Sequence, residues 1–558
     1  MKMNILKYLP SIACAILASF VSCNDLDLAP TNKFTDLNYW TSEAKASSVL
    51  SMAYSQMMSS GYFFADERLS DNLYEGRGST DEKLITSGQA NAALGRFSED
   101  WKKCFEGIKT CHTFLENVDR VPDMDETLKN RMKAEARFIR AMLFFRLANN
   151  YGDVPLFDYT LTIEEANTIA RSPKADVIKF VRDELNDIVG TLPTRQEYAA
   201  ADNGRITKGA AMTLLARTYL YENDWQNVSS VCEKIINGEY GEYALFSSYA
   251  GLFLPENEYN SEVILDMGYL LNLRTWSEMY DGIPLSVGGR VNGFAPTQEL
   301  VDDYIMKNGR SIHESGSGYK EEDPYINRDP RLQATIVYHG YQWTDGNGKT
   351  STIYIKPGSS ADAGAANLDE YIGPGQNSTA TGYYLRKWFD PTAPAGLASG
   401  LNLILMRYAD VLLMYAEAKT ELGEMNETVW NKTIRPIRER AGFTDASALN
   451  YPASGDMQTI VRRERRCELA IEGTRLYDIR RWKTIETALN GNPRGAKFAA
   501  DNTQYIQLDK RSFNKDRDYL FAIPQSQRDI NKNLTQNPGR TECGFGSFHK
   551  RTDRGFYP

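Results

Sequence analysis

The densest group of residues that could do chemistry lies at residues 462–482, whose sequence is RRERRCELAIEGTRLYDIRRW. Glu464, Glu468 and Glu472 are spaced i, i+4 and i+8, so a single helix would place their carboxylates on one face. Such acids can serve catalysis, but an arginine lies within reach of each of them and no His accompanies them. We therefore predict a network of ion pairs that joins neighbouring helices, in preference to a catalytic centre.

Other sequence motifs for catalysis or metal binding are absent. The 558 residues include four His, and no two of them have the spacing of a helical metal-binding pair. The sequence also lacks a zinc ribbon, a P-loop, a GxSxG motif and a dinucleotide fingerprint. A formal charge of −9 argues against a nucleic-acid partner, which would need a basic patch. We expect no enzyme activity, metal or cofactor, although the 73 Asp and Glu leave a glycosidase-like carboxylate pair open.

Aromatic residues in irregular segments are the best candidates for ligand binding. A flat aromatic face matches the apolar face of a sugar ring, and Asn, Asp or Arg can bind its hydroxyls. Some candidates lie in a long early connection, others before a Gly-rich loop or beside the turn at residues 345–348. Packing within their own loops stays the alternative for each of them. The candidates are Asn72, Tyr74, Arg77, Trp276, Tyr280, Tyr341 and Trp343.

The first 22 residues have the pattern of a secretory signal peptide. Lys2 and Lys7 precede a mostly apolar, uncharged run at residues 8–21, which is shorter than the ~20 residues of a membrane span. Residues 20–23, with the sequence FVSC, resemble a bacterial lipobox, although Leu is usual in place of Phe20. We expect cleavage before Cys23, lipidation of Cys23 and a polar tether over residues 23–38; an ordinary signal peptide is the alternative.

The remaining cysteines have no metal or disulfide pattern. Cys104 and Cys111 are seven residues apart on a predicted helix, hence about 10 Å apart, which is too far for a disulfide. We expect these two, Cys232 and Cys467 to be small buried apolar residues.

The element that organises the scaffold is a predicted helix at residues 406–422, with the sequence MRYADVLLMYAEAKTEL. Two apolar stripes with helical spacing run along it, and a third, mostly polar face contains Arg407, Asp410 and Glu417. A helix that is apolar on two sides must be covered on two sides. We therefore predict that it lies inside a layered stack of helices.

The rest of the chain divides into two helical parts around an irregular segment. Residues 39–238 form an N-terminal helical scaffold in which 208–221 and 225–237 make a helical hairpin similar to a tetratricopeptide repeat. Residues 239–400 form a loop-rich insertion with short strands, since 281–400 hold 17 of the 41 glycines. Residues 401–558 complete the scaffold. The predicted class is mainly α, with a tetratricopeptide-like scaffold and an irregular subdomain that contributes to ligand binding.

Nine segments, in order, resemble the SusD/RagB family of Bacteroidetes outer-membrane lipoproteins. No single segment is unique to the family, but together they span nearly the whole mature chain. They are Cys23 with its lipobox, LDLAP at 26–30, AEARFIRAMLFFRLANNYGDVPL at 134–156, RITKGAAMTLLARTYLY at 205–221, RDPRL at 328–332, RYADVLLMYAEA at 407–418, RERAGF at 438–443, the Glu/Arg-rich motif at 464–482, and LFAIPQSQRDINKNLTQNPG at 520–539.

The resemblance implies a function that the residue patterns alone do not. Proteins of this family sit on the cell surface at the outer membrane, bind glycans without a reaction and cap a SusC-like TonB-dependent transporter that imports the captured oligosaccharide. Some relatives deliver peptides instead, so peptide capture is an alternative, and a glycoside hydrolase is a further one. The family shares scaffold motifs and not ligand contacts, so the aromatic candidates are not carried over from it.

Overall fold

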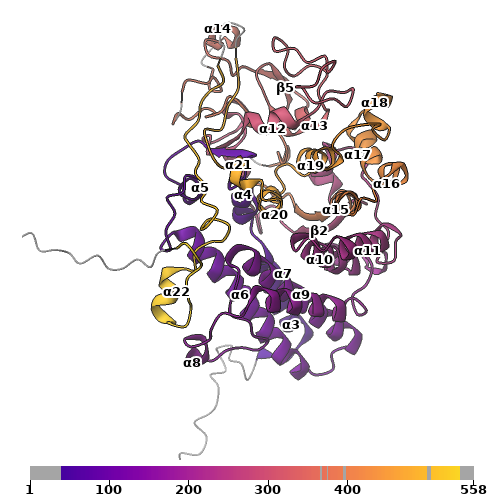
Figure 1. Cartoon of the computed structure of the whole chain (residues 1–558). Helices are drawn as coiled ribbons and strands as arrows, with labels where there is room; N and C mark the ends of the chain where they lie inside the picture. The colour runs from indigo at the N-terminus through magenta and orange to yellow at the C-terminus, as the bar shows by residue number, and fades with distance from the viewer. Residues whose placement is uncertain (1–38, 365–366, 374, 394–397, 499–503, 541–558) are drawn as a thin grey trace, which may run out of the picture.

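A computed structural model describes residues 39–364, 367–373, 375–393, 398–498 and 504–540 (Figure 1). Helices dominate both ends of the described chain, and short strands interrupt them in the middle. No helix among these residues is long and apolar enough to cross a membrane. The predicted mainly α class is confirmed.

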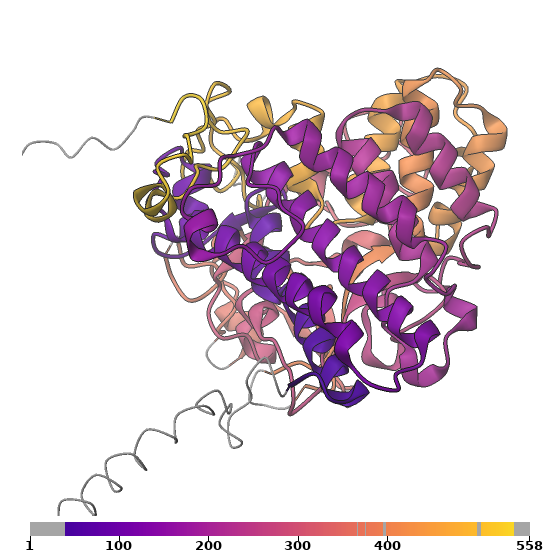
Figure 2. The ribbon, with the colours of Figure 1, turned by 90° about the horizontal axis from the view of Figure 1, so that it is seen from below.

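The N-terminal part is a layer of helices packed in chain order. α3 packs on α6, α6 on α7, α7 on α9, α9 on α10 and α10 on α11, and Figure 2 shows these long helices side by side. The helices of this part are α3 (Glu43–Met57), α4 (Ser60–Arg68), α5 (Asp81–Thr86), α6 (Gly95–Asn117), α7 (Glu126–Tyr151), α8 (Ile163–Ala166), α9 (Lys174–Ile188), α10 (Lys208–Tyr221) and α11 (Trp225–Ile236).

The predicted helical hairpin is confirmed at α10 and α11. α10 begins after Thr207, whose side chain accepts a hydrogen bond from the Ala210 amide and caps the helix. α11 begins after Asp224, which caps the Asn227 amide in the same way. Short capping side chains thus fix both helix starts close to their predicted positions.

The middle segment carries short strands that pair in four antiparallel ribbons: β1 with β3, β2 with β8, β4 with β7, and β5 with β6. It lies above the helical layer in Figure 1. Its elements, with β1 from the early connection, are β1 (Leu73–Glu75), β2 (Val263–Met267), β3 (Phe294–Pro296), α12 (Gln298–Asp303), α13 (Arg331–Thr335), β4 (Ile336–Val337), β5 (Tyr341–Thr344), β6 (Thr350–Ile353), α14 (Ser360–Ala363) and β7 (Tyr384–Leu385).

The C-terminal part returns to helices and closes the scaffold. α15 packs against both α11 and α19, so it lies between the two helical parts. The elements are β8 (Leu403–Arg407), α15 (Tyr408–Glu421), α16 (Glu427–Lys432), α17 (Ile434–Ala441), α18 (Ala446–Leu449), α19 (Met457–Glu468), α20 (Arg475–Arg481), α21 (Ile485–Ala488) and α22 (Gln525–Ile530).

α15 is covered on both of its apolar faces, as predicted. One stripe belongs to a cluster with α17 and α19, and the other belongs to the main core of the protein; the stripes are Ala409, Leu412, Leu413 and Ala416, and Val411, Tyr415 and Ala418. The helix begins at Tyr408 and not at Met406, because Leu403–Arg407 pairs with β2 as a strand.

The third, polar face of α15 is buried as well. Asp410 accepts hydrogen bonds from Arg217 at 2.8 Å and from Arg465 at 2.6 Å. Glu417 accepts two from Arg481, both at 2.6 Å. Buried carboxylates are tolerated only when they are paired. Ion pairs therefore hold α15 on its third face, which its two apolar stripes do not cover.

Cys104, Cys111, Cys232 and Cys467 are buried free thiols, as predicted. Burial raises the pKa of the Cys111 thiol to about 12, so this sulfur stays protonated and behaves as an apolar side chain.

Candidate functional site

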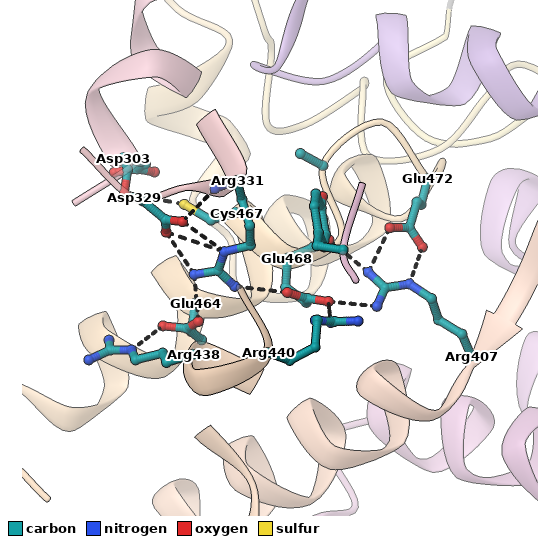
Figure 3. A network of polar contacts seen from close by, with 12 residues as sticks. Asp303, Asp329, Arg331, Arg407, Arg438, Arg440, Glu464, Cys467, Glu468 and Glu472 are labelled. Atoms are coloured by element: carbon teal, nitrogen blue, oxygen red, sulfur yellow. Dashed lines mark hydrogen bonds and ion pairs between the residues drawn. The ribbon is translucent and has the colours of Figure 1, made fainter. Parts of the chain in front are cut away.

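The Glu/Arg-rich motif forms a buried network of ion pairs (Figure 3). Arg331 on α13 reaches Glu464 at 2.7 Å and Glu468 at 2.8 Å, and Arg407 at the end of β8 reaches Glu468 at 2.6 Å. The network joins five cations to five carboxylates: Arg331, Lys387, Arg407, Arg438 and Arg440, with Glu262, Asp329, Glu464, Glu468 and Glu472. The predicted joining of neighbouring elements by ion pairs is confirmed.

One detail of that prediction is wrong. α19 ends at Glu468, and Glu472 follows in a turn where Ile471 has a φ of 62°. The three glutamates therefore do not share one helix face. Glu472 still joins the network, because the turn directs its carboxylate to Arg407 at 2.7 Å and Lys387 at 2.6 Å.

Three carboxylates of the network, those of Glu464, Glu468 and Glu472, have a lowered pKa and are held in the ionised state. Burial alone would raise the pKa of Glu468, but Arg440, Arg407 and Arg331 together lower it below its usual range. The pKa of Glu464 is lowered by Arg331 and Arg438 against the same effect of burial. A carboxyl with a lowered pKa is a poor proton donor near neutral pH, so the network has the properties of a structural element.

A hollow of about 650 Å³ lies directly beside this network. Arg331, Lys387 and Arg440 belong to both, so the network forms one wall of the hollow. Residues at the ends of β4, β5 and β7 also line it. Its other lining residues include the aromatic Tyr249, Phe253, Tyr338, Tyr341, Trp388 and Phe389 and the polar Ser247, Ser248, Gln333, Gln342 and Arg386.

The short strands position Tyr338, Tyr341 and Arg386 at the hollow. β4 and β7 are antiparallel and pair Ile336 with Leu385 and Val337 with Tyr384, so Tyr338 and Arg386 leave from opposite ends of this two-residue ribbon. Both still line the hollow. The Tyr338 and Tyr341 rings lie 5.6 Å apart, edge to face. Tyr341 donates its hydroxyl to the carbonyl of Gln333 at 2.8 Å, which fixes its ring while the side chain stays only half-buried.

The hairpin that carries Tyr341 depends on its turn. Asp345 accepts hydrogen bonds from the amides of Asn347 and Lys349, each at 2.9 Å, and Gly348 has a φ of 80°. A Cβ at Gly346 would lie 2.3 Å from the carbonyl oxygen of Pro391. The backbone at Pro391 can therefore approach this turn so closely only because residue 346 is a glycine. The DGNG sequence therefore fixes β5 beside residues 386–391.

Arg386 lies over two aromatic rings. Its guanidinium carbon is 4.1 Å from the centre of the Trp343 ring and 5.0 Å from that of Phe389, both within cation–π range. It donates to the carbonyl of Thr344 at 3.1 Å. The result is a half-buried cation on an aromatic base, beside half-buried Tyr341 and Phe389. Aromatic faces with nearby amide, hydroxyl and guanidinium groups can hold a sugar by stacking and hydrogen bonds.

Of the seven predicted ligand contacts, Tyr341 lines the hollow and Trp343 lies beneath it. The Trp343 side chain is only 1% exposed, so it supports Arg386 and offers no free face to a ligand. Trp276 is 4% exposed and donates its indole N–H to the carbonyl of Leu401, and Tyr280 is buried too. For these three residues the structure gives a packing role in place of the expected ligand contact, because neighbouring core residues cover their rings.

The three early candidates lie elsewhere. Asn72 is fully buried, donates to Glu67 at 2.6 Å and accepts from Arg466 at 2.8 Å, so its amide is occupied by structural contacts in place of the expected ligand. Tyr74 is buried, and its hydroxyl donates a hydrogen bond to Asp509 at 3.0 Å. Arg77 stays partly exposed and donates to Asn377 at 2.7 Å, outside the lining of the hollow. The structure therefore does not gather the seven candidates at one site.

Sequence reasoning missed Tyr338, Arg386 and Phe389. The signal that could have found Arg386 and Phe389 is the run YYLRKWF at residues 383–389, where two cations stand among aromatic residues inside the Gly-rich segment. This run lies near Tyr341 only because β4 pairs with β7, and that pairing could not be predicted from the sequence. The predicted lipidation at Cys23 lies outside the described residues.

Two family models match the sequence over separate ranges. The model described as "SusD family" matches residues 262–539, and the one described as "Starch-binding associating with outer membrane" matches residues 26–220. Together they extend from the predicted tether to the last described helix.

Relatives and solved structures agree with these matches. The SusD-like protein P25 of Formosa agariphila is 27% identical over 406 residues, which cover 69% of this chain and 70% of that protein. The SusD-like protein P2 of the same organism is 24% identical over 94% of this chain and 98% of its own. A crystal structure of a SusD-like carbohydrate binding protein from Bacteroides fragilis is 28% identical, covers 89% of this chain and 100% of its own, and superposes with a TM-score of 0.80.

SusD-like structures have a tetratricopeptide-like helical fold, so the predicted fold class is confirmed. The family matches over both halves and the structural likeness over nearly the whole fold lead to one assignment: this chain belongs to the SusD family.

Proposed function

We propose that this protein captures glycans without a catalytic step and passes them to a TonB-dependent transporter. The observation that carries the proposal is the hollow of about 650 Å³, where half-buried Tyr338, Tyr341 and Phe389 stand among amide and hydroxyl groups. The matching model described as starch-binding and the carbohydrate binding protein of similar structure support a glycan as the ligand.

A binding role also agrees with the chemistry of the polar groups beside the hollow. Its neighbouring carboxylates are each engaged by Arg or Lys, and Glu468 has a lowered pKa. A glycoside hydrolase of the usual type needs one carboxyl that can donate a proton. We therefore place this chain among binding proteins.

The test compares binding and reaction on the same glycans. The purified protein and a Tyr341→Ala variant are titrated by calorimetry with neutral and acidic polysaccharides, and released reducing ends are measured in parallel. We expect binding without release, and a loss of at least tenfold in affinity on Tyr341→Ala because a stacking face is removed. A Tyr159→Ala variant, which changes an exposed tyrosine outside the hollow, serves as the control and should bind normally. Failure to bind any polysaccharide would overturn the proposal.

The cellular part of the proposal is a lipid-anchored protein on the outer membrane. It rests on the lipobox at residues 20–23 and on the family description that names the outer membrane. A Cys23→Ala variant should leave the membrane fraction, and the unchanged protein should co-purify with a TonB-dependent transporter. If Cys23→Ala stays in the membrane fraction, the lipid anchor is refuted.

A further inference from the structure

The lining of the hollow has an unbalanced charge. Among the described residues that form it, four are cations and none is Asp or Glu: Arg331, Arg386, Lys387 and Arg440. The whole sequence, by contrast, has a formal charge of −9. A positively charged hollow in an acidic protein is a local feature, and clefts lined by one sign of charge concentrate ligands of the opposite sign.

Three of these four cations are neutralised by carboxylates of the buried network. Arg331 pairs with Asp329, Glu464 and Glu468, Arg440 pairs with Glu262 and Glu468, and Lys387 pairs with Glu472. The network to which they belong balances five cations with five carboxylates. Its own charges cancel, so it adds little net potential to the hollow.

Arg386 is the cation of this lining that no carboxylate among the described residues balances. Its contacts are the rings of Trp343 and Phe389 and the carbonyl oxygen of Thr344, all of them uncharged. Its Nη1 is buried and has no hydrogen-bond partner in the part of the chain that the structure describes. Burial lowers the pKa of this guanidinium, as expected for a cation that has lost water and gained no counter-ion, yet arginine stays protonated near neutral pH.

The aromatic rings under Arg386 also determine where its guanidinium lies. The buried Trp343 ring occupies the space on the interior side of Arg386, so the guanidinium stays at the hollow. Tyr341 and Phe389 line the same hollow. An anion bound there would meet the guanidinium while its ring stacks on a neighbouring aromatic face. Guanidinium groups suit carboxylate and sulfate because both can accept paired hydrogen bonds.

We propose that the hollow selects acidic glycans, in which a carboxylate or sulfate group of the sugar pairs with Arg386. This inference rests on the proposed function and names the class of its ligand. Neutral sugars would leave the guanidinium without a counter-ion, and that unpaired charge disfavours them against acidic sugars of the same backbone.

The test uses pairs of polysaccharides that differ only in charge. Polygalacturonate is compared with its fully methyl-esterified form, iota-carrageenan with desulfated carrageenan, and chondroitin sulfate with its desulfated, carboxyl-reduced form; starch, laminarin, xylan and galactan are neutral references. Affinity electrophoresis ranks them and calorimetry measures the best ligand. We expect that ligand to be acidic, to bind at least tenfold more tightly than its neutral counterpart, and to weaken as NaCl rises from 50 to 500 mM.

Variants distinguish the effect of the Arg386 charge from the effect of the overall charge of this surface. Arg386→Gln should lower affinity for the acidic ligand at least tenfold, and Arg386→Lys should restore part of it because it keeps the charge. Lys349→Gln removes an equal charge from the turn between β5 and β6, outside the lining of the hollow, and should change affinity less than twofold. Thermal unfolding of each variant shows whether it is folded.

The outcomes distinguish this inference from the proposed function. If a neutral polysaccharide binds best and Arg386→Gln binds it normally, the selection of acidic glycans is refuted while glycan capture stands. If Lys349→Gln weakens binding as much as Arg386→Gln, the role of Arg386 is refuted. If no polysaccharide of either kind binds, the proposed function falls and this inference falls with it.

Discussion

Asp266 on β2 should make the stability of this protein fall as pH rises. The side chain is 4% exposed and accepts one hydrogen bond from the Asn402 amide at 2.9 Å. Burial, together with the nearby Glu258 carboxylate, raises its pKa from 3.8 to about 7, and the Asn402 hydrogen bond opposes this only in part. The folded protein therefore holds a proton that the unfolded chain releases at a lower pH.

The sign and size of the effect follow from that difference. Between pH 5 and 7 the unfolded chain has lost the proton while the folded protein keeps it, so the free energy of unfolding decreases by about 1.4 kcal/mol per pH unit. The decrease ends above the folded pKa. Asp266→Asn removes the titration and can still accept from Asn402. Its stability relative to the unchanged protein should therefore rise by about 2 to 3 kcal/mol from pH 5 to pH 8.

The assay is urea unfolding of both proteins at pH 5 and pH 8. Any constant cost of the substitution cancels, because only its change with pH is read. The raised pKa of Glu75, about 7, cancels as well, since both proteins keep that residue. Asp516→Asn, at an exposed position, is the matched control and should follow the unchanged protein. Equal differences between Asp266→Asn and the unchanged protein at the two pH values would refute the reasoning.

Two further substitutions test the core and the network. Trp276→Ala should lower the free energy of unfolding by about 3 to 5 kcal/mol, since it leaves a cavity and frees the carbonyl of Leu401; a change below 1 kcal/mol in urea unfolding would contradict the buried position. Arg407→Met should also cost about 3 to 5 kcal/mol, because it deprives three buried carboxylates of a partner. In the same assay Arg435→Met, which removes an exposed pair with Glu439, should cost less than about 1 kcal/mol; similar losses in both variants would argue against the importance of burial.

Local patterns predicted the scaffold well. The stripes of α15 were readable because a helical period places residues three and four apart on one face. The starts of α10 and α11 were predicted at residues 208 and 225, where the structure has them, and Thr207 and Asp224 cap these starts. These features depend on neighbours within a few residues, so no tertiary information was needed.

The main failure was to predict which residues are buried in the irregular segment and in the early connection between α4 and α6. Trp276, Trp343 and Asn72 stand in loops or short strands, and no period marks which of their sides is covered. Their neighbours come from distant parts of the chain: Leu401 accepts from Trp276, and Arg466 donates to Asn72. An aromatic residue in a loop has the same local sequence whether its ring packs inside or faces solvent.

By itself, therefore, the sequence determined a helical scaffold, a two-sided α15 and a set of acids and arginines that had to pair, because periodicity, caps and charge are local properties. The tertiary structure alone decided which charge stays unpaired. Arg331, Lys387 and Arg440 pair with carboxylates far along the chain, while the partners of Arg386 within the described part of the chain are aromatic rings and a carbonyl. That difference comes from how short strands fold the middle segment against α19, and it gives the hollow its charge.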